Sequence, residues 1–134
     1  MITFRVDGVP IPQGSKKGFK VGKHVNIVDD NSTKLKPWRA EIAAVTDVGF
    51  TFVEPVLVAA VFYLPRPKTV RRFYPSVKPD LDKLMRALGD GMTDGGLIRD
   101  DSLIVSQWIH KRYADDKNPP GVRVLVTAAE EKKV

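Results

Sequence analysis

Residues 78–101 read KPDLDKLMRALGDGMTDGGLIRDD and carry both a helical pattern and most of the chain's clustered carboxylates. Apolar side chains recur at helical spacing at Leu81, Leu84, Met85 and Leu88. This spacing predicts a helix from about Asp80 to Gly91, with Asp80 at its N-cap. Asp82, Arg86 and Asp90 then share the polar face of that helix. The run from Thr93 to Gly96 predicts a turn, from which an extended piece leads to Asp100 and Asp101.

The flanking sequence predicts a mixed sheet and a second helix. Apolar patterns predict strands at residues 2–6, 104–113 and 122–127, and a basic hairpin at residues 13–28. Caps at residues 31–33 and apolar residues at helical spacing predict a helix to about Asp47. The continuous apolar run from Val56 to Leu64 predicts a strand buried on both faces, and Trp38 and Trp108 are expected in the core. The fold class is therefore a single α+β domain over residues 1–134, with two main helices.

Length and composition exclude several classes of protein. A chain of 134 residues with 43% hydrophobic residues forms one domain with a substantial core. The absence of cysteine excludes disulfides, thiolate zinc sites and cysteine nucleophiles. No apolar run approaches the ~18 residues that span a bilayer, and the first residues lack the pattern of a signal peptide. We therefore expect a cytoplasmic protein with no membrane partner.

The net charge of +6 is unevenly distributed along the chain. Residues 80–101 hold six Asp against three basic residues, a net charge of −3, so the remainder carries +9. A basic surface of this kind predicts a nucleic-acid partner. The candidate DNA-contacting residues lie in two basic segments and are Lys16, Lys17, Lys20, Arg66, Lys68, Arg71, Arg72, Phe73 and Lys78. For Phe73 two interpretations remain open, insertion into DNA and anchoring of its loop.

The carboxylate cluster indicates a divalent cation. Clustered carboxylates repel one another, and a bound cation removes that repulsion. Oxygen ligands without His or Cys favour Mg²⁺, with Mn²⁺ as a substitute. The structural alternative is that Asp80 only caps the helix and that Asp82 forms an ordinary i,i+4 ion pair with Arg86.

These residues resemble the RusA family of Holliday-junction resolvases. The family's pattern is Pro-Asp-x-Asp at a helix start followed by an Asp-Asp pair, here Pro79-Asp80-Leu81-Asp82 and Asp100-Asp101. The resemblance implies that Asp80, Asp82 and Asp101 bind the catalytic magnesium. The chain departs from the pattern at Lys83, where the family usually has Asn, and at Arg86, where it often has Lys. Lys111 matches a basic position of the family, so Arg86 and Lys111 are both candidates for a catalytic positive charge.

The resemblance implies a RusA-like fold and a magnesium-dependent endodeoxyribonuclease. Such an enzyme resolves four-way DNA junctions by paired symmetric nicks in recombination and repair, and it acts as a homodimer. Two other hypotheses remain. The first is a non-catalytic DNA-binding accessory protein of recombination with a structural Asp cluster, and the second is a magnesium-dependent phosphotransferase acting on a small nucleotide.

Overall fold

Strand β4 (Val56–Leu64) organises the sheet in this computed structural model. It pairs antiparallel with β6 (Gly121–Ala128) and parallel with β5 (Ile104–Tyr113), in the order β1-β6-β4-β5, where β1 is Ile2–Asp7. The structure describes residues 1–14, 16–21, 24–29 and 32–130, without the side chains of residues 16–32. Within these ranges, the predicted α+β class, the mixed sheet and its strands are confirmed.

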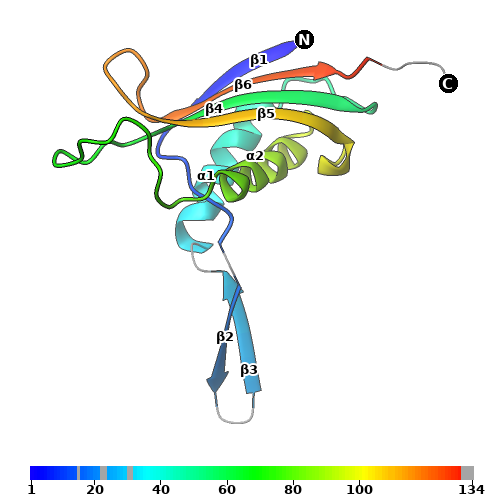
Figure 1. The fold of residues 1–134 in the computed structure, drawn as a ribbon. Helices are drawn as coiled ribbons and strands as arrows, with labels where there is room; N and C mark the ends of the chain where they lie inside the picture. Colours follow the sequence, from blue (N-terminus) through cyan, green and yellow to red (C-terminus); the bar gives the residue numbers. More distant parts are fainter. Residues whose placement is uncertain (15, 22–23, 30–31, 131–134) are drawn as a thin grey trace.

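The prediction that β4 is buried on both faces is wrong for one face. Burial alternates along the strand, with Val58, Ala60 and Phe62 buried and the residues between them only half-buried. Figure 1 shows the reason, since both helices lie on the same side of the sheet. The outer face of β4 is thus apolar in sequence but only half-buried in the structure.

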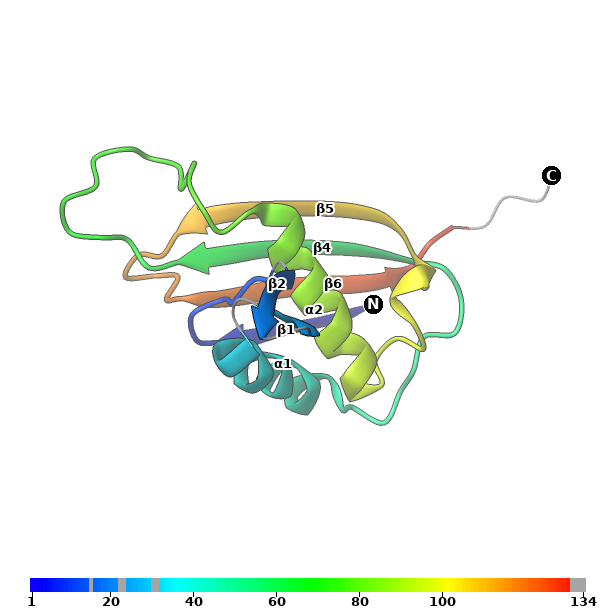
Figure 2. The ribbon, with the colours of Figure 1, turned by 90° about the horizontal axis from the view of Figure 1, so that it is seen from below.

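The helices cross beneath the sheet and pack on each other (Figure 2). Helix α1 (Ser32–Thr46) contacts β1, and α2 (Leu81–Gly95) contacts β5 at the other edge. Helix α2 also provides the crossover that joins the parallel strands β4 and β5. Its amphipathic pattern explains its placement, because Leu84, Met85 and Leu88 are buried while the polar face looks outward.

Helix α2 continues one turn beyond the predicted end at Gly91. It runs to Gly95, and Gly96 then adopts a left-handed conformation at φ 83°, with its backbone N–H bonded to the last turn. Gly91 and Gly95 lie against Ile42, Ala43 and Thr46 of α1 so closely that a Cβ atom would clash with them. Helix packing therefore outweighs the low helix propensity of glycine here, and the close approach fixes how α1 supports α2.

Gly91→Ala should lower the free energy of unfolding by about 1–3 kcal/mol, despite the better helix propensity of alanine. The new Cβ would lie 2.6 Å from Ile42 Cγ2 and 2.7 Å from Ile42 Cβ, so α1 must move. The matched control is Gly89→Ala in the same helix, whose Cβ would make ordinary contacts of 3.6 and 3.8 Å. Urea unfolding of both variants measures the difference, and equal stabilities would contradict the packing argument.

The predicted basic hairpin is present as a two-stranded ribbon. Strands β2 (Lys16–Val21) and β3 (His24–Asp29) pair antiparallel, and they project from the helical side of the molecule (Figure 1). The side chains of Lys16, Lys17 and Lys20 lie outside the described residues, so their expected DNA contacts stay a prediction.

Candidate active site

The start of α2 presents the first two carboxylates of the motif. Asp80 is at the N-cap with extended backbone, and its carbonyl accepts from the backbone N–H of Leu84 at 3.1 Å. Its side chain makes no capping hydrogen bond and is exposed. The structural alternative predicted that the side chain of Asp80 caps the helix. No such cap is formed, so the Asp80 carboxylate is not used to stabilise the start of α2.

Asp82 and Asp101 meet at an open hollow of about 270 Å³ between α2 and β5. Asp82 and Arg86 come from the polar face of α2, and Asp101 comes from a short 3-10 turn, η1 (Asp101–Leu103). Gly89 of α2 lies next to Asp101, since a Cβ atom at Gly89 would be in ordinary contact with the Cβ of Asp101 at 3.6 Å. The rest of the lining is Met85, Ile104 and Gln107. The fold thus joins one carboxylate of each half of the motif in a single hollow, whereas Asp80 is outside its lining.

Asp100 has a structural role, whereas the neighbouring Asp101 lines the hollow. Its carboxylate accepts from the backbone N–H of Ser102 at 3.1 Å and from the Ser102 hydroxyl. These hydrogen bonds, with that of the hydroxyl foremost, hold the pKa of Asp100 below its usual value. Asp100 therefore caps η1 and sets the direction of the chain at Asp101.

Arg86 lines the hollow and is exposed to solvent. Among the described residues it forms no ion pair, with Asp82 or with any other carboxylate. The i,i+4 pair of the structural alternative is therefore not formed. A guanidinium beside two carboxylates, and bound to neither, is available to an anionic ligand.

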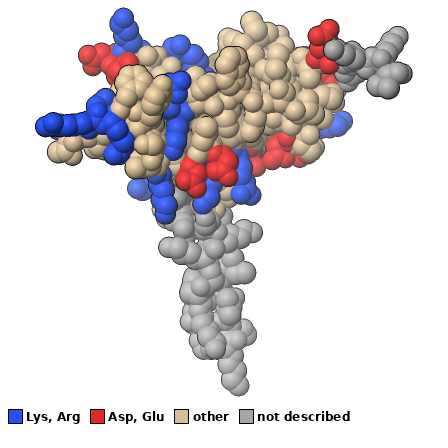
Figure 3. Space-filling view, viewed as in Figure 1, with Lys and Arg blue, Asp and Glu red and all other residues tan. Residues whose placement is uncertain are grey.

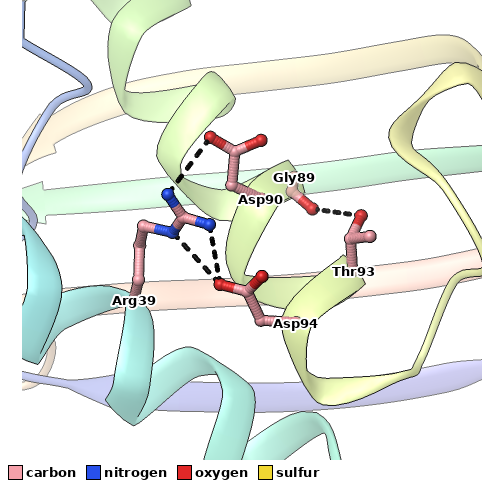
Figure 4. Close-up of polar contacts among 5 residues, drawn as sticks. All are labelled: Arg39, Gly89, Asp90, Thr93 and Asp94. Carbon is pink, nitrogen blue, oxygen red and sulfur yellow. Dashed lines mark hydrogen bonds and ion pairs between the residues drawn. The ribbon is translucent and has the colours of Figure 1, made fainter.

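The other acidic residues of α2 are engaged by α1 (Figure 4). Arg39 donates to one oxygen of Asp94 from Nε at 3.1 Å and from Nη2 at 2.8 Å, and its Nη1 is 3.9 Å from Asp90. Partial burial raises the pKa of Asp90, and the nearby Arg39 opposes that rise. Asp90 shares the helix face of Asp82 in the sequence pattern. In the structure it lies between Arg39 of α1 and the charges of Asp101 and Arg86, which also act on its pKa, Asp101 raising it and Arg86 lowering it.

Lys111 holds the chain just before the motif. From β5 its Nζ donates to the carbonyl oxygens of Val77 at 2.8 Å and Pro79 at 2.9 Å. It does not line the hollow, so the geometry suits a positioning role for Lys111 better than contact with a phosphate. Sequence reasoning missed these hydrogen bonds from Lys111 to the backbone before the motif. It also missed Gln107, which lines the hollow from the same side of β5.

The basic segment at residues 65–78 forms a loop beyond the end of the sheet (Figure 2). Its candidate DNA-contacting side chains are all exposed, namely Arg66, Lys68, Arg71, Arg72, Phe73 and Lys78. Rings of two tyrosines anchor the loop, since Arg66 and Arg72 lie over Tyr113 and Arg112 lies over Tyr74. Phe73 is 71% exposed, and its ring packs in a T-shaped arrangement against the ring of Tyr74. Its exposure favours contact with a ligand over a core anchor.

A comparison with models of protein families shows to which family the chain belongs. The family model described as endodeoxyribonuclease RusA matches residues 7–127. The chain belongs to the RusA family. The match includes both helices, the basic loop and the hollow, and it supports a nuclease that acts on Holliday junctions. No curated protein matches the chain. Within the described part of this RusA protein, no helix is long and apolar enough to cross a membrane.

The donor atoms of this RusA site fit Mg²⁺ in kind. In the ranges that the structure describes, no three side chains of Asp, Glu, His or Cys stand close enough to enclose a metal ion. Mg²⁺ rarely needs such a cage, because it commonly binds one or two carboxylates and completes its shell with water and substrate phosphate. Asp82 and Asp101 in one hollow match that requirement. Figure 3 shows acidic side chains gathered beneath the sheet with basic side chains on either side.

Proposed function

We propose that this protein is a magnesium-dependent endodeoxyribonuclease that resolves four-way DNA junctions by paired nicks, acting as a homodimer with one active site in each subunit. The observation that carries the proposal is the hollow where Asp82 and Asp101 meet beside the unpaired Arg86. Two carboxylates that share a hollow repel each other, and a bound cation would offset that repulsion. Membership of the RusA family supports DNA as the substrate.

Each residue has a distinct role in this proposal. Asp82 and Asp101 would hold the ion, and the exposed carboxylate of Asp80 would assist from the helix start. Bound Mg²⁺ supplies Lewis-acid polarisation of the phosphodiester and a water of lowered pKa. Arg86 would contact the non-bridging phosphate oxygens, where negative charge grows in the transition state. Hydrolysis would leave a 5′-phosphate and a 3′-hydroxyl.

The basic surface would position the junction. Arg66, Lys68, Arg71 and Arg72 lie in the loop that leads into Asp80 and α2, so DNA bound there would lie near the start of the motif helix. Phosphate contacts carry affinity without reading base sequence. We therefore expect selectivity to come mainly from the shape of the branched DNA.

The proposal is tested by incubating the protein with labelled four-way junction, duplex and single-stranded DNA, each with Mg²⁺, with Mn²⁺ and with EDTA. We expect symmetric nicks in the junction alone, lost in EDTA and restored by either metal. Junction binding without cleavage under every condition would support the accessory DNA-binding protein instead. Transfer or hydrolysis of phosphate on a free nucleotide, with all three DNAs left intact, would support the phosphotransferase.

Replacing Arg71 and Arg72 together by Ala should reduce the salt dependence of junction binding. For each phosphate contact that is lost, about one more counterion stays on the DNA when the protein binds. The slope of log K against log salt should therefore fall in magnitude by about 1–2. Fluorescence anisotropy in EDTA measures the slope without cleavage. The matched control removes Lys34 and Lys36, two exposed residues of α1 outside the basic loop, and should change the slope less. Equal slopes for the loop variant and the wild type would place the loop away from the DNA.

A further inference from the structure

Strand β5 turns the side chain of Gln107 toward the active-site hollow. Neighbouring residues of a strand point to opposite faces of the sheet, so every second residue shares a face. Ile109, two residues further on, packs against the core on the helical side, and Gln107 pairs in register with the buried Val58 of β4. Gln107 therefore lies on the inner face of the sheet, where it lines the hollow.

The next residue along the strand, Trp108, points to the outer face and is 71% exposed. The prediction that Trp108 lies in the core is therefore wrong, whereas Trp38, at 4% exposed, is in the core as predicted. Both helices cover the inner face only (Figure 1), so the side of β5 that carries Trp108 stays open. A step of one residue thus separates Gln107, which lines the hollow, from a side chain that points away from it.

The side-chain amide of Gln107 is available to a ligand. The residue is exposed to solvent, and among the described residues its amide forms no hydrogen bond. An uncharged amide has two N–H donors and one carbonyl acceptor. It can therefore bind an oxygen of a phosphate without the repulsion that a further carboxylate would add to the hollow.

The two sides of the hollow carry groups that suit a phosphodiester. Helix α2 supplies Asp82 and Arg86, η1 supplies Asp101, and Gln107 is the polar residue that β5 contributes. A phosphodiester between α2 and β5 would meet a cationic donor on one side and a neutral donor on the other. Its two non-bridging oxygens can accept from both, and contacts from two directions hold the group in one orientation.

We infer that Gln107 contacts the scissile phosphate, with its side-chain amide donating to a non-bridging oxygen on the side of the hollow that faces Arg86. The inference rests on the proposed function and adds a residue to it. Asp82 and Asp101 would hold the ion, Arg86 would balance the charge that develops, and Gln107 would fix the orientation of the phosphate. A donor already in place before the reaction should affect the rate more than the affinity for the junction.

The first measurement is the single-turnover rate of junction cleavage by Gln107→Leu, which keeps the size of the side chain and removes its hydrogen bonds. We expect a rate loss of about 10- to 100-fold at saturating Mg²⁺, as for one hydrogen bond to a charged group. Junction affinity in EDTA should stay nearly unchanged. Gln107→Glu should lose rate as well and should also bind the junction more weakly in EDTA, because a third carboxylate repels phosphate.

The matched control is Ser106→Ala, which removes a polar group from the same strand on the outer face. Ser106 is exposed and lies one residue before Gln107, so it points away from the hollow. The control should cleave at the wild-type rate. A Gln107→Leu rate within about threefold of wild type, an effect below 1 kcal/mol, would overturn the inference.

Sulfur substitution at the scissile phosphate tests the contact itself. Each non-bridging oxygen is replaced in turn by sulfur, a weak acceptor, and cleavage is measured with Mn²⁺, which tolerates sulfur better than Mg²⁺ does. One of the two stereoisomers should slow the wild type but not Gln107→Leu, in which the hydrogen bond is already lost. Equal slowing of both proteins by both stereoisomers would overturn the inference, because groups that share no contact have additive effects.

Mn²⁺ binding to the free protein, measured by calorimetry, does not depend on cleavage. The affinity should be the same for the wild type and Gln107→Leu, and it should fall in Asp82→Asn. Loss of Mn²⁺ affinity in Gln107→Leu would overturn the inference, because the amide would then serve the metal and not the phosphate. A wild type that cleaves no DNA would overturn the proposed function together with this inference, whereas wild-type cleavage by Gln107→Leu would overturn the inference alone.

Discussion

Asp82→Asn is expected to lower Mg²⁺-dependent cleavage of a four-way junction by about 10³-fold or more, while junction binding stays equal or becomes tighter. The change keeps the size of the side chain but removes an anionic oxygen from the hollow that Asp82 shares with Asp101. Loss of several kcal/mol of metal-dependent stabilisation corresponds to a rate loss of this order. Tighter binding would follow from reduced repulsion of phosphates. Single-turnover cleavage and anisotropy in EDTA measure the two effects separately.

Two further substitutions make the test specific. Asp101→Asn should behave like Asp82→Asn, because it removes the facing carboxylate. Asp94→Asn is the matched control, since it makes the same chemical change in the same helix at a residue bonded to Arg39. It should cleave at nearly the wild-type rate. If Asp82→Asn retained a rate within about threefold of wild type, an effect below 1 kcal/mol, Asp82 could not be a metal ligand.

The motif helix was predictable because its pattern is local. Leu84 and Leu88 are buried and Asp82 is exposed, as a helical period requires. The spacing of the carboxylates predicted that the Asp100-Asp101 pair could join those of the helix start. That Asp101 in particular meets Asp82 depends on the β4–α2–β5 crossover, and it was expected only through the family pattern. The predicted end of α2 at Gly91 was too early. Gly95 is favoured in the helix by its close contact with α1, and a pattern of residues within α2 alone cannot show that contact.

The roles of the remaining charged residues depended on tertiary contacts. Asp90 and Arg86 stand on the same predicted helix face, yet α1 brings Arg39 to Asp90 and nothing in the described chain pairs with Arg86. Lys111 has the sequence context of any basic residue in a strand, and only the fold places Pro79 next to it. The exposure of Trp108 had the same cause, since a strand pattern does not say which of its faces the helices cover.

Arg86→Ala is expected to reduce the single-turnover rate at saturating Mg²⁺ by about 10²-fold, with little loss of junction affinity. An unpaired guanidinium beside Asp82 and Asp101 can stabilise charge that develops on the phosphate only during the reaction. Such a contact changes the rate of the chemical step more than the binding of the ground state. Arg86→Lys should recover part of the rate, because the charge survives while the planar fork does not.

The matched control for Arg86 is Arg39→Ala, which removes a guanidinium whose partners are the carboxylates of Asp94 and Asp90. Because that pair is partly exposed, the control should lower the stability by about 1 kcal/mol or less and leave the rate nearly unchanged. Melting curves recorded with the rate measurements separate the two roles. A normal rate with a lowered melting temperature in Arg86→Ala would assign Arg86 to the fold, and the positive charge at the phosphate would then have to come from another residue, with Lys111 tested next.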